Sequence, residues 1–471
     1  MRISHHNKGA LLILVLIFGA IFLTLIVGFM RVVLIQVTVQ KEMTHSAQAR
    51  EIAEAGLDYY KWRLAHYPDD LQNGTNAPGP YVMVYEDPEL GPVGEFSLEF
   101  ASTTYCGDVS SIEITSTGHT YGNPDVKRTV YGRYARPTVA EYAYIINSNV
   151  WAGDDRTIIG PYHSNGGIRM DGVNNSIVTS GQETWKCDSN YGCSPTKHNA
   201  NGVIGDGPNH DLWSFPSTPI NFTGLTVDLA NMQDKAKNGG GVYIPPSGKQ
   251  GYKIVLKSNG TFDLYVVNKK DNEPQGNAWG YRLNKIKNAK YEGNYNISAS
   301  CPLVFVEDMV WLEGEVSGLV TIAAADVDTV GSDPSMILNN NITYSSDEAG
   351  LLAIAEYDML VGFDVPNNME LEGIFVAQNG HFGRNFYNAN DLPSAWDQYV
   401  KRNSLTINGT IVSNGSVGTK WICYAWWLGE HYCSGFETRF NSYDRNLVDN
   451  PPPLAPRTSD DFKFVEWLEV E

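Results

Sequence analysis

The chain has 471 residues and a formal net charge of −19, with 34 basic and 53 acidic side chains. An acidic surface repels the phosphates of nucleic acid and anionic lipid headgroups at long range, so we expect no nucleic-acid partner for the chain alone. The 45 glycines, 26 tyrosines and 11 tryptophans, with only 18% charged residues, favour an extracellular and mainly β body. A local basic patch at Lys285, Lys287 and Lys290 stays open as an exception.

The first element is an apolar run from Ala10 to Met30 without a charged residue. These 21 residues would form a helix about 32 Å long, enough to cross a hydrocarbon core about 30 Å thick. Helix-compatible sequence continues to residue 66, whereas a signal peptide would end after a shorter apolar core. We therefore predict one helix over residues 10–66 that begins in the inner membrane. A plain signal anchor is the alternative explanation of the apolar run.

A short leader, residues 1–9, precedes the helix. The sequence Lys8-Gly9-Ala10-Leu11-Leu12 resembles the processing site of type IV pilins and type II secretion pseudopilins, which prepilin peptidase cuts after the glycine. Glycine suits such a site because it lets a protease approach the backbone closely. Residues 49–60, which contain Ala-Glu-Ala-Gly-Leu, also resemble the helix of PilX-type minor pilins.

This resemblance implies a role for Leu14 in filament packing. Most pilins carry a glutamate at the fifth residue after cleavage, where it neutralises the amine of the preceding subunit in an apolar core. Leu14 occupies that position here. A subunit without the acid fits best where no subunit precedes it, at the filament tip. The implied partners are other pilin or pseudopilin subunits, prepilin peptidase and the inner membrane.

Alternating apolar and polar residues predict a small antiparallel sheet within residues 67–139. Its expected strands are Gly94–Phe100, Ser111–Gly118 and Val126–Tyr134. We expect its apolar face to pack against the helix, as the resemblance to a pilin also implies. The helix residues expected at this contact are Ile52, Ala55, Tyr59 and Trp62.

All six cysteines follow the helix, which suits disulfides in an oxidising compartment and places the body outside the cytoplasm. Two short loops predict local pairs, Cys187 with Cys193 and Cys423 with Cys433. Cys106 and Cys301 are then either paired or free. A zinc site is the alternative, but the sequence has neither Cys-x-x-Cys nor His-x-x-x-His.

From residue 140 to residue 471 a weak repeat of polar-glycine corners and short apolar runs predicts a right-handed parallel β-helix. The corners end at Gly172, Gly314, Gly373 and Gly409. Their irregular intervals leave a β-sandwich as the alternative. Residues 216–297 are expected to form an inserted α/β subdomain, with a helix over Thr226–Asn238 and a hairpin of Tyr252–Lys257 with Thr261–Val267.

Candidates for chemistry are few. The carboxylates Asp154-Asp155 and Glu307-Asp308 form no recognisable catalytic motif, so we expect no enzyme and no cofactor. Asp326 and Asp328 would share one face of a strand and could contribute to a Ca²⁺ site, but two carboxylates fall short of the ligands that Ca²⁺ needs.

Aromatic residues gather around the Cys423–Cys433 loop, namely Trp421, Tyr424, Trp426, Trp427 and Tyr432. They could stack on a surface glycan or bury into a protein ligand, and they could equally cap the end of the β body.

The sequence thus predicts a minor pilin-like subunit that displays a large β domain, with an α+β pilin-like module at its N-terminus. The alternative is a membrane-anchored β-helix protein that binds or cleaves carbohydrate and never polymerises.

Overall fold

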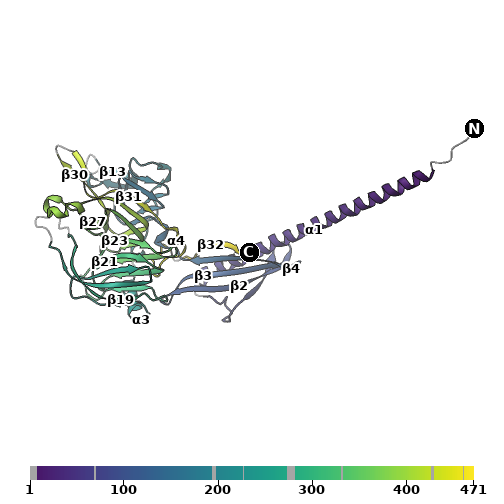
Figure 1. Cartoon of the computed structure of the whole chain (residues 1–471), viewed down its shortest axis with the longest axis horizontal. Helices are drawn as coiled ribbons and strands as arrows, with labels where there is room; N and C mark the ends of the chain where they lie inside the picture. Colours follow the sequence, from purple (N-terminus) through teal and green to yellow (C-terminus); the bar gives the residue numbers. More distant parts are fainter. Residues whose placement is uncertain are drawn as a thin grey trace, which may run out of the picture. The chain divides into compact units, whose positions relative to one another are not determined.

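The structure is a computed structural model that describes residues 8–67, 70–193, 198–225, 228–272, 282–329, 332–425, 429–459 and 461–470. A long N-terminal helix is followed by mainly β structure (Figure 1). The chain divides into two compact units. Unit 1 comprises Met1–Ala101, Ile112–Tyr134 and Glu466–Glu471, and unit 2 comprises Ser102–Ser111 and Ala135–Val465.

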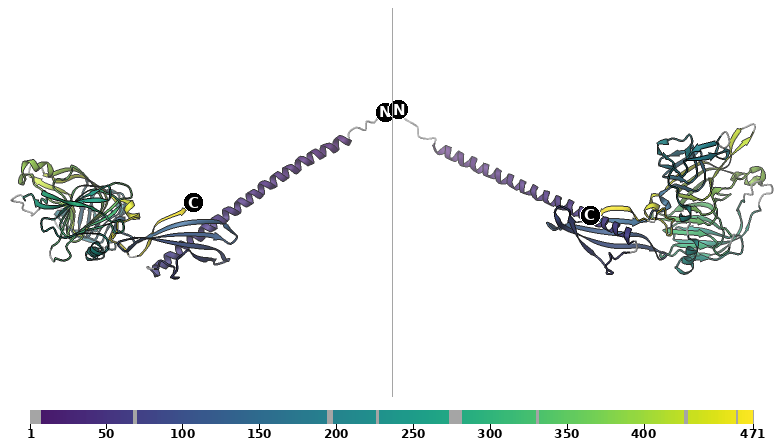
Figure 2. Two further views of the ribbon diagram at one scale, coloured as in Figure 1. Left: turned by 60° about the horizontal axis from the view of Figure 1, so that its bottom comes forward. Right: turned by 180° about the vertical axis from the view of Figure 1, so that it is seen from behind.

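Unit 1 consists of helix α1 (Lys8–His66) and a sheet in the order β1-β2-β3-β4-β32. The strands are β1 (Tyr81–Asp87), β2 (Gly91–Tyr105), β3 (Asp108–Thr120), β4 (Asn123–Ala135) and β32 (Lys463–Val470). The C-terminal part of α1 lies against the sheet (Figure 2). The three predicted strands are confirmed, within β2, β3 and β4.

The boundaries of the units differ from the contiguous ranges that the sequence predicted. Strand β1 was not expected, and β32 adds a strand from the far end of the chain to the sheet of unit 1. Residues Ser102–Ser111, at the end of the β2–β3 hairpin, belong to unit 2. Strand β1 pairs with β2 in a local hairpin, with Asp87 opposite Gly91, whereas the place of β32 depends on pairing between distant segments, which no local pattern shows.

Unit 2 is built from parallel ladders of strands. The longest, called the first ladder, runs β16-β20-β22-β24-β26-β28-β5-β8-β11-β15. Its strands are β16 (Val242–Ile244), β20 (Leu303–Val306), β22 (Leu319–Ala324), β24 (Gly350–Ala355), β26 (Asn368–Ala377), β28 (Lys401–Ser413), β5 (Tyr144–Ile146), β8 (Tyr162–Ser164), β11 (Val178–Ser180) and β15 (Trp213–Ser214).

The second ladder runs β17-β21-β23-β25-β27-β29, and a third pairs β26-β28-β31-β7-β10. The strands not yet given are β17 (Tyr252–Lys257), β21 (Val310–Val316), β23 (Met336–Tyr344), β25 (Met359–Val361), β27 (Phe382–Arg384), β29 (Val417–Gly418), β31 (Gly429–Ser442), β7 (Arg156–Ile159) and β10 (Val173–Asn174). From β20 to β29, successive strands alternate between the first and second ladders, whereas β7 and β10 of the earlier coils belong to the third. The chain thus forms stacked coils.

Smaller pairings complete the β structure. Strands β6 (Val150–Ala152), β9 (Ile168–Met170) and β14 (Val203–Ile204) form a parallel sheet of their own. Antiparallel pairs are β12 (Thr184–Cys187) with β13 (His198–Asn201), and β30 (Lys420–Ala425) with β31. The short helices are α2 (Phe222–Leu225), α3 (Leu229–Asn238), α4 (Arg445–Asp449), η1 (Val139–Glu141), η2 (Ser189–Tyr191), η3 (His210–Leu212), η4 (Ala389–Asp391) and η5 (Ser394–Tyr399).

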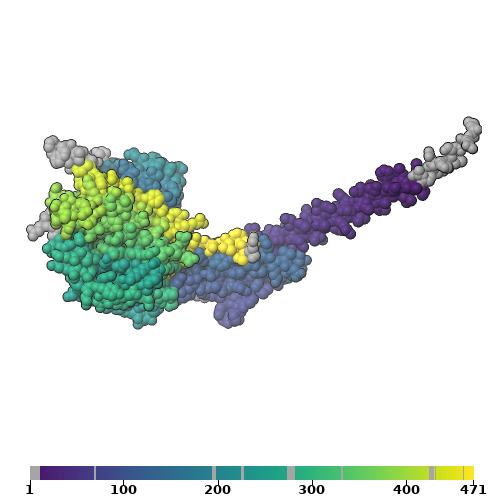
Figure 3. Space-filling view, viewed as in Figure 1, coloured from purple at the N-terminus to yellow at the C-terminus, as the bar shows by residue number. Residues whose placement is uncertain are grey.

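The order of the coils in space is not their order along the chain. Strand β5 enters beside β28, the next coils continue to β15, and the chain then restarts at β16, at the opposite end of the first ladder. It winds back until β31 lies between β28 and β7. In Figures 1 and 3 the blue coils therefore lie beside yellow and green segments, and the teal coils lie farther away.

The predicted inserted subdomain is not a separate body, because β16 pairs with β20 and β17 pairs with β21. Both strands belong to stacked coils. The antiparallel addition of β18 (Thr261–Lys270) and β19 (Ile286–Asn296) to β17 departs from the ladders, and it contains the predicted hairpin. Helix α3 begins after Asp228, whose side chain accepts a hydrogen bond from the Asn231 N–H, 2.9 Å away.

Three of the predicted glycine corners lie inside strands, and at Gly373 and Gly409 the strand passes from one set of neighbouring strands to another. Gly314, Gly373 and Gly409 have φ of +116°, +146° and +140°. Gly373 pairs with Gly409 in successive coils, and a Cβ on Gly409 would lie 1.9 Å from the Gly373 carbonyl oxygen. A side chain there would be excluded by both the backbone conformation and the close stacking.

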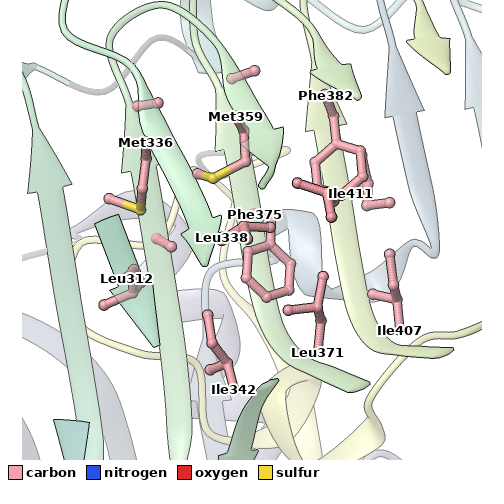
Figure 4. Close-up of a cluster of buried hydrophobic side chains, with 14 of the residues drawn as sticks. Leu312, Met336, Leu338, Ile342, Met359, Leu371, Phe375, Phe382, Ile407 and Ile411 are labelled. Atoms are coloured by element: carbon pink, nitrogen blue, oxygen red, sulfur yellow. The ribbon is translucent and has the colours of Figure 1, made fainter. Parts of the chain in front are cut away.

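The interior of the coils is apolar, and residues at equal positions of successive coils stack on one another (Figure 4). Met336, Met359 and Phe382 form one such row through the second ladder. The outer face of the first ladder is also buried, under α3, α4 and η1. Burial on both faces explains why its strands are continuous apolar runs, such as Leu303–Val306, without alternation.

Candidate functional site: the N-terminal helix

The first part of α1 exposes its apolar side chains on every side. Leu11, Phe18 and Phe29 are 69%, 63% and 72% exposed, and large exposed apolar residues continue to Met43. The helix is long and apolar enough to cross a membrane, and none of its most apolar window is buried. Leu14 is one of these exposed residues. This part of α1 has no contact within the described structure that would keep its apolar surface from water.

The second part of α1 is docked on the sheet of unit 1 through small residues. Ala49, Ala53 and Gly56 follow one another at helical spacing and face β3. A Cβ on Gly118 of β3 would lie 2.3 Å from the Ala49 carbonyl oxygen, and a Cβ on Gly56 would lie 2.3 Å from Ser116 Oγ. The missing side chains let the helix backbone approach the strand closely, which gives the Ala-Glu-Ala-Gly-Leu sequence a physical reason.

Larger side chains complete the contact on either side of this close approach. Ile52, Leu57, Tyr60 and Leu64 are buried against apolar residues of β2, β3 and β4. The Tyr60 ring stacks on Phe100 with the centroids 4.0 Å apart. Each fully buried side chain of this kind contributes about 1.5–3 kcal/mol relative to exposure. The docked half of the helix is therefore held strongly.

Hydrogen bonds hold the middle and the C-terminal end of the docked half. Tyr134 of β4 donates its hydroxyl to the Leu57 carbonyl over 3.1 Å, and Tyr60 donates to the Asp70 carbonyl over 2.6 Å. Burial raises the pKa of both tyrosines, so they stay neutral donors. Arg63 Nε lies 2.7 Å from Asp70 Oδ2 just beyond the helix.

The C-terminal strand β32, which forms one edge of the sheet next to β4, adds ion pairs to the contact. Glu469 pairs with Arg128 of β4 at 2.5 Å and with Arg50 of α1 at 3.8 Å. The Arg50 guanidinium also lies 5.4 Å from the ring centroid of Trp467. Partly exposed pairs contribute little individually, about 0–1 kcal/mol, but these three elements share one network.

The sequence prediction of the docking face is right for Ile52 and wrong for Trp62, which is 54% exposed. Ala55 and Tyr59 lie at the edge of the contact. The helix is buried at positions 49, 53, 57, 60 and 64. The docking face is therefore rotated about the helix axis from the predicted one, toward Leu57 and Tyr60. Sequence reasoning missed Gly118 in β3. A glycine inside an alternating strand is the signal that could have indicated close backbone approach.

The processing residues Lys8, Gly9 and Ala10 lie at the start of α1, but their side chains are outside the described residues, as is the leader from residue 1 to residue 7. Cleavage after Gly9 stays a prediction.

The cysteines form three disulfides in unit 2. Cys187 pairs with Cys193 and Cys423 with Cys433, as their spacing predicted, and Cys106 pairs with Cys301 across 195 residues. Cys106 lies in the turn between β2 and β3. The sequence did not predict whether it is paired or free. The short pairs close local loops, whereas the third joins distant segments.

Of the candidate ligand aromatics, only Trp421 and Tyr432 have described side chains. Trp426 and Trp427 lie outside the described residues, and for Tyr424 only the backbone is described. Trp421 Nε1–H donates to the Arg384 carbonyl over 3.0 Å, and the Tyr432 hydroxyl donates to the Arg402 carbonyl over 3.0 Å. Both rings are thus anchored to the coils, and Trp421 remains partly exposed.

The candidate carboxylates have structural partners. Asp155 accepts two bonds from Arg439, at 2.7 and 2.6 Å, and Lys420 lies 3.4 Å away. Glu307 accepts from Tyr243 and from Gln233, and Asp328 accepts from Gln233 over 3.1 Å. Asp326 accepts from the Thr329 N–H over 3.0 Å.

Within the described ranges, no three His, Cys, Asp or Glu side chains are arranged to hold a metal ion.

Comparisons with known proteins add little. No family model and no curated protein matches the chain. Among solved structures, the crystal structure of the competence-associated pilin ComZ from Thermus thermophilus aligns over 91% of this chain and 98% of its own, with 15% identity and a TM-score of 0.29. A TM-score this low does not establish a common fold, so the function is inferred from this chain's own residues.

Proposed function

We propose that this chain is a pilin-like structural subunit whose helix α1 anchors it in the membrane and then packs against the helices of other subunits. One observation carries the proposal. A single unbroken helix changes from an apolar surface exposed on all sides, up to Met43, to a docked surface that begins at Ala49. The same element thus has a free half for assembly and a fixed half that holds the sheet of unit 1.

The length of the free half favours assembly over simple anchoring. A bilayer needs about 20 apolar residues. The exposed apolar surface begins at Leu11 and continues through Leu34 and Ile35 to Val39 and Met43, well past one span. The surplus would face water in a plain anchor, at a cost of about 25 cal/mol per Å² of apolar area. Neighbouring apolar helices would cover it.

The parallel coils of unit 2 would then be a β-helix body that the filament displays outside the cytoplasm. Three disulfides suit an oxidising compartment. The body is large relative to the sheet of unit 1, which favours few copies over repeated stacking along a shaft. Leu14 stands where most pilins have a glutamate, and this also favours a position at the filament tip.

Mass spectrometry of the N-terminus tests the proposal. In cells with active prepilin peptidase we expect the mature chain to begin at Ala10. Gly9→Leu should abolish cleavage because it crowds the protease. Gly19→Leu is the matched control, since a Cβ on Gly19 meets no atom within 4 Å, and it should be processed normally. Native protein that retains Met1 would contradict the pilin assignment and favour the anchored alternative.

The tip position has its own test. Immunogold labelling of unit 2 should mark filament ends at low copy number, and Leu14→Glu should leave initiation unchanged or impair it, because the added charge finds no partner amine. Even labelling along the shafts would reject the tip position without affecting the assignment of the helix.

A further inference from the structure

A groove of about 510 Å³ is lined by residues of unit 2, between Tyr357 and Trp421 in the sequence. Its lining comes from the turns that join the first ladder to the second, and from β27, β29 and β30. Groups at these positions come from stacked coils and recur at the strand spacing of about 4.8 Å.

Gly418 lines the groove and carries no side chain. Strands β25, β27 and β29 pair in register, so Leu360, Gly383 and Gly418 form one outward row beside the inward row of Met359, Phe382 and Val417. A Cβ on Gly418 would meet no atom within 4 Å. A larger side chain could therefore enter the groove without disturbing the core.

One wall consists of polar groups on three successive turns. Asp358 Oδ1 lies 2.7 Å from His381 Nδ1 and accepts the His381 backbone N–H over 2.9 Å, so the carboxylate is held in place. Gly380 permits this approach, because a Cβ there would lie 2.2 Å from Asp358 Oδ1. Asn379 and Ser416 project from the neighbouring turns and are exposed.

An asparagine ladder orders the third turn. Asn165 donates to Asn147 over 2.8 Å, and Asn147 donates to Asn414 over 2.7 Å. The carbonyl oxygen of the Asn414 side chain is thereby occupied, which orients its NH₂ group as a donor. Asn385 lines the other side and is anchored through its Nδ2 to the Arg282 carbonyl, 2.9 Å away.

Aromatic rings flank these polar groups. Trp421 is fixed by its bond to the Arg384 carbonyl and by an edge contact with Phe386, with centroids 5.7 Å apart. Tyr357 also lines the groove and is 43% exposed. A fixed ring such as that of Trp421 offers a flat apolar face at little entropic cost.

We propose that this groove binds a neutral saccharide. Sugar rings combine C–H faces, which pack on aromatic rings, with hydroxyl groups that pair with carboxylates and amides. The groove offers both, with Trp421 and Tyr357 as apolar surfaces and Asp358, Asn379 and Asn414 as polar partners.

The charges decide against an anionic ligand. Arg384 lines the groove, but its guanidinium is buried and donates to the Gly362, Phe363 and Tyr399 carbonyls. Asp358 supplies negative charge at the wall, where the imidazole of His381, cationic only when protonated, lies 2.7 Å from it, and the whole chain carries −19. Phosphate, sulfate or uronate groups would therefore meet repulsion. The inference goes beyond the proposed assembly role and holds whether or not the chain polymerises.

Full-length protein in detergent micelles, applied to an array of neutral and acidic oligosaccharides, tests the inference, and calorimetry then measures affinity for the best neutral probe. Gly418→Leu should fill the groove and weaken binding by about tenfold or more. Trp421→Ala should weaken it through loss of the ring face by about twofold to tenfold. Trp467→Ala, at the 44% exposed tryptophan of unit 1, is the matched control and should bind like the native protein.

Three outcomes would overturn the inference: no neutral probe bound above background, preferred binding to acidic glycans, or undiminished binding by Gly418→Leu. Because neither readout involves processing or filaments, this failure is distinguishable from failure of the proposed function. If Trp421→Ala loosens the hairpin of β30 and β31, Gly418→Leu still tests the groove, because it does not remove a side chain from that hairpin.

Discussion

In unit 1, most elements that pack together are neighbours in the sequence, whereas in unit 2 many paired strands are far apart in the sequence. In unit 1 the helix, β1, β2, β3 and β4 follow one another, and only β32 comes from far away. In unit 2 the first coils lie against the last, and β31 lies between β28 and β7. Local packing of small residues thus holds the helix, whereas the coil stack depends on long-range closures.

The largest effect is expected from the long-range disulfide. Replacing Cys106 and Cys301 by serine opens a link across 195 residues, and the chain-entropy model gives a loss of about 5 kcal/mol. The matched double replacement of Cys187 and Cys193 opens a link across 6 residues and should cost about 2 kcal/mol. Guanidinium unfolding followed by tryptophan fluorescence measures both. Equal losses would show that unit 2 does not depend on its long-range closure.

The next effect concerns a long-range ion pair. Asp155→Asn should cost about 3 kcal/mol, because Arg439 is only 8% exposed and would keep a buried charge without its carboxylate. Asp154→Asn is the matched control, since that neighbouring side chain is exposed and should change stability by less than about 0.5 kcal/mol. Thermal unfolding of the two variants should separate them clearly, and similar melting would contradict the role of Asp155.

The same pair predicts a pH dependence. Burial raises the pKa of Asp155, but the bonds and charge of Arg439, with Lys420, outweigh burial and lower the pKa overall. A lowered folded-state pKa means that the pair stabilises above the ordinary carboxyl pKa, near about pH 4, and is lost as pH falls below it. The native protein should therefore lose its advantage over Asp155→Asn in acid.

A smaller effect is expected at the docked half of α1. Gly56→Leu should cost about 1–3 kcal/mol, because a Cβ there already meets Ser116 Oγ at 2.3 Å and Phe96 at 2.9 Å. Gly28→Leu is the control in the free half, where a Cβ meets no atom within 4 Å. Hydrogen exchange of residues 49–64 should increase only in Gly56→Leu. Unchanged exchange would mean that the close approach does not hold the helix.

Features that depend on local spacing could be predicted from the sequence, and features that depend on distant segments could not. The helix, three strands of unit 1 and the two short disulfides depend on local spacing, and each is where the pattern placed it. The membership of β32 in the sheet, the position of β5 beside β28 and the Cys106–Cys301 bond depend on distant segments, which no local pattern encodes. The groove was missed for the same reason, because Asp358, His381 and Gly418 converge only when coils stack.

The docking face shows a subtler limit. Apolar residues occur on several sides of α1 near Trp62, so periodicity alone allowed a rotated face. Gly56 and Gly118 determine the actual one, since the helix can approach the sheet only where both lack a side chain.

Photo-crosslinking along α1 distinguishes assembly through this helix from simple anchoring. A photoreactive phenylalanine analogue at Phe18, in the free half, should give crosslinks to another pilin-like subunit in cells that assemble filaments. The same analogue at Tyr60, which is fully buried in unit 1, should give only crosslinks within the chain. Crosslinks from Phe18 to lipid alone, under conditions where filaments form, would contradict assembly through this helix and leave only an anchor.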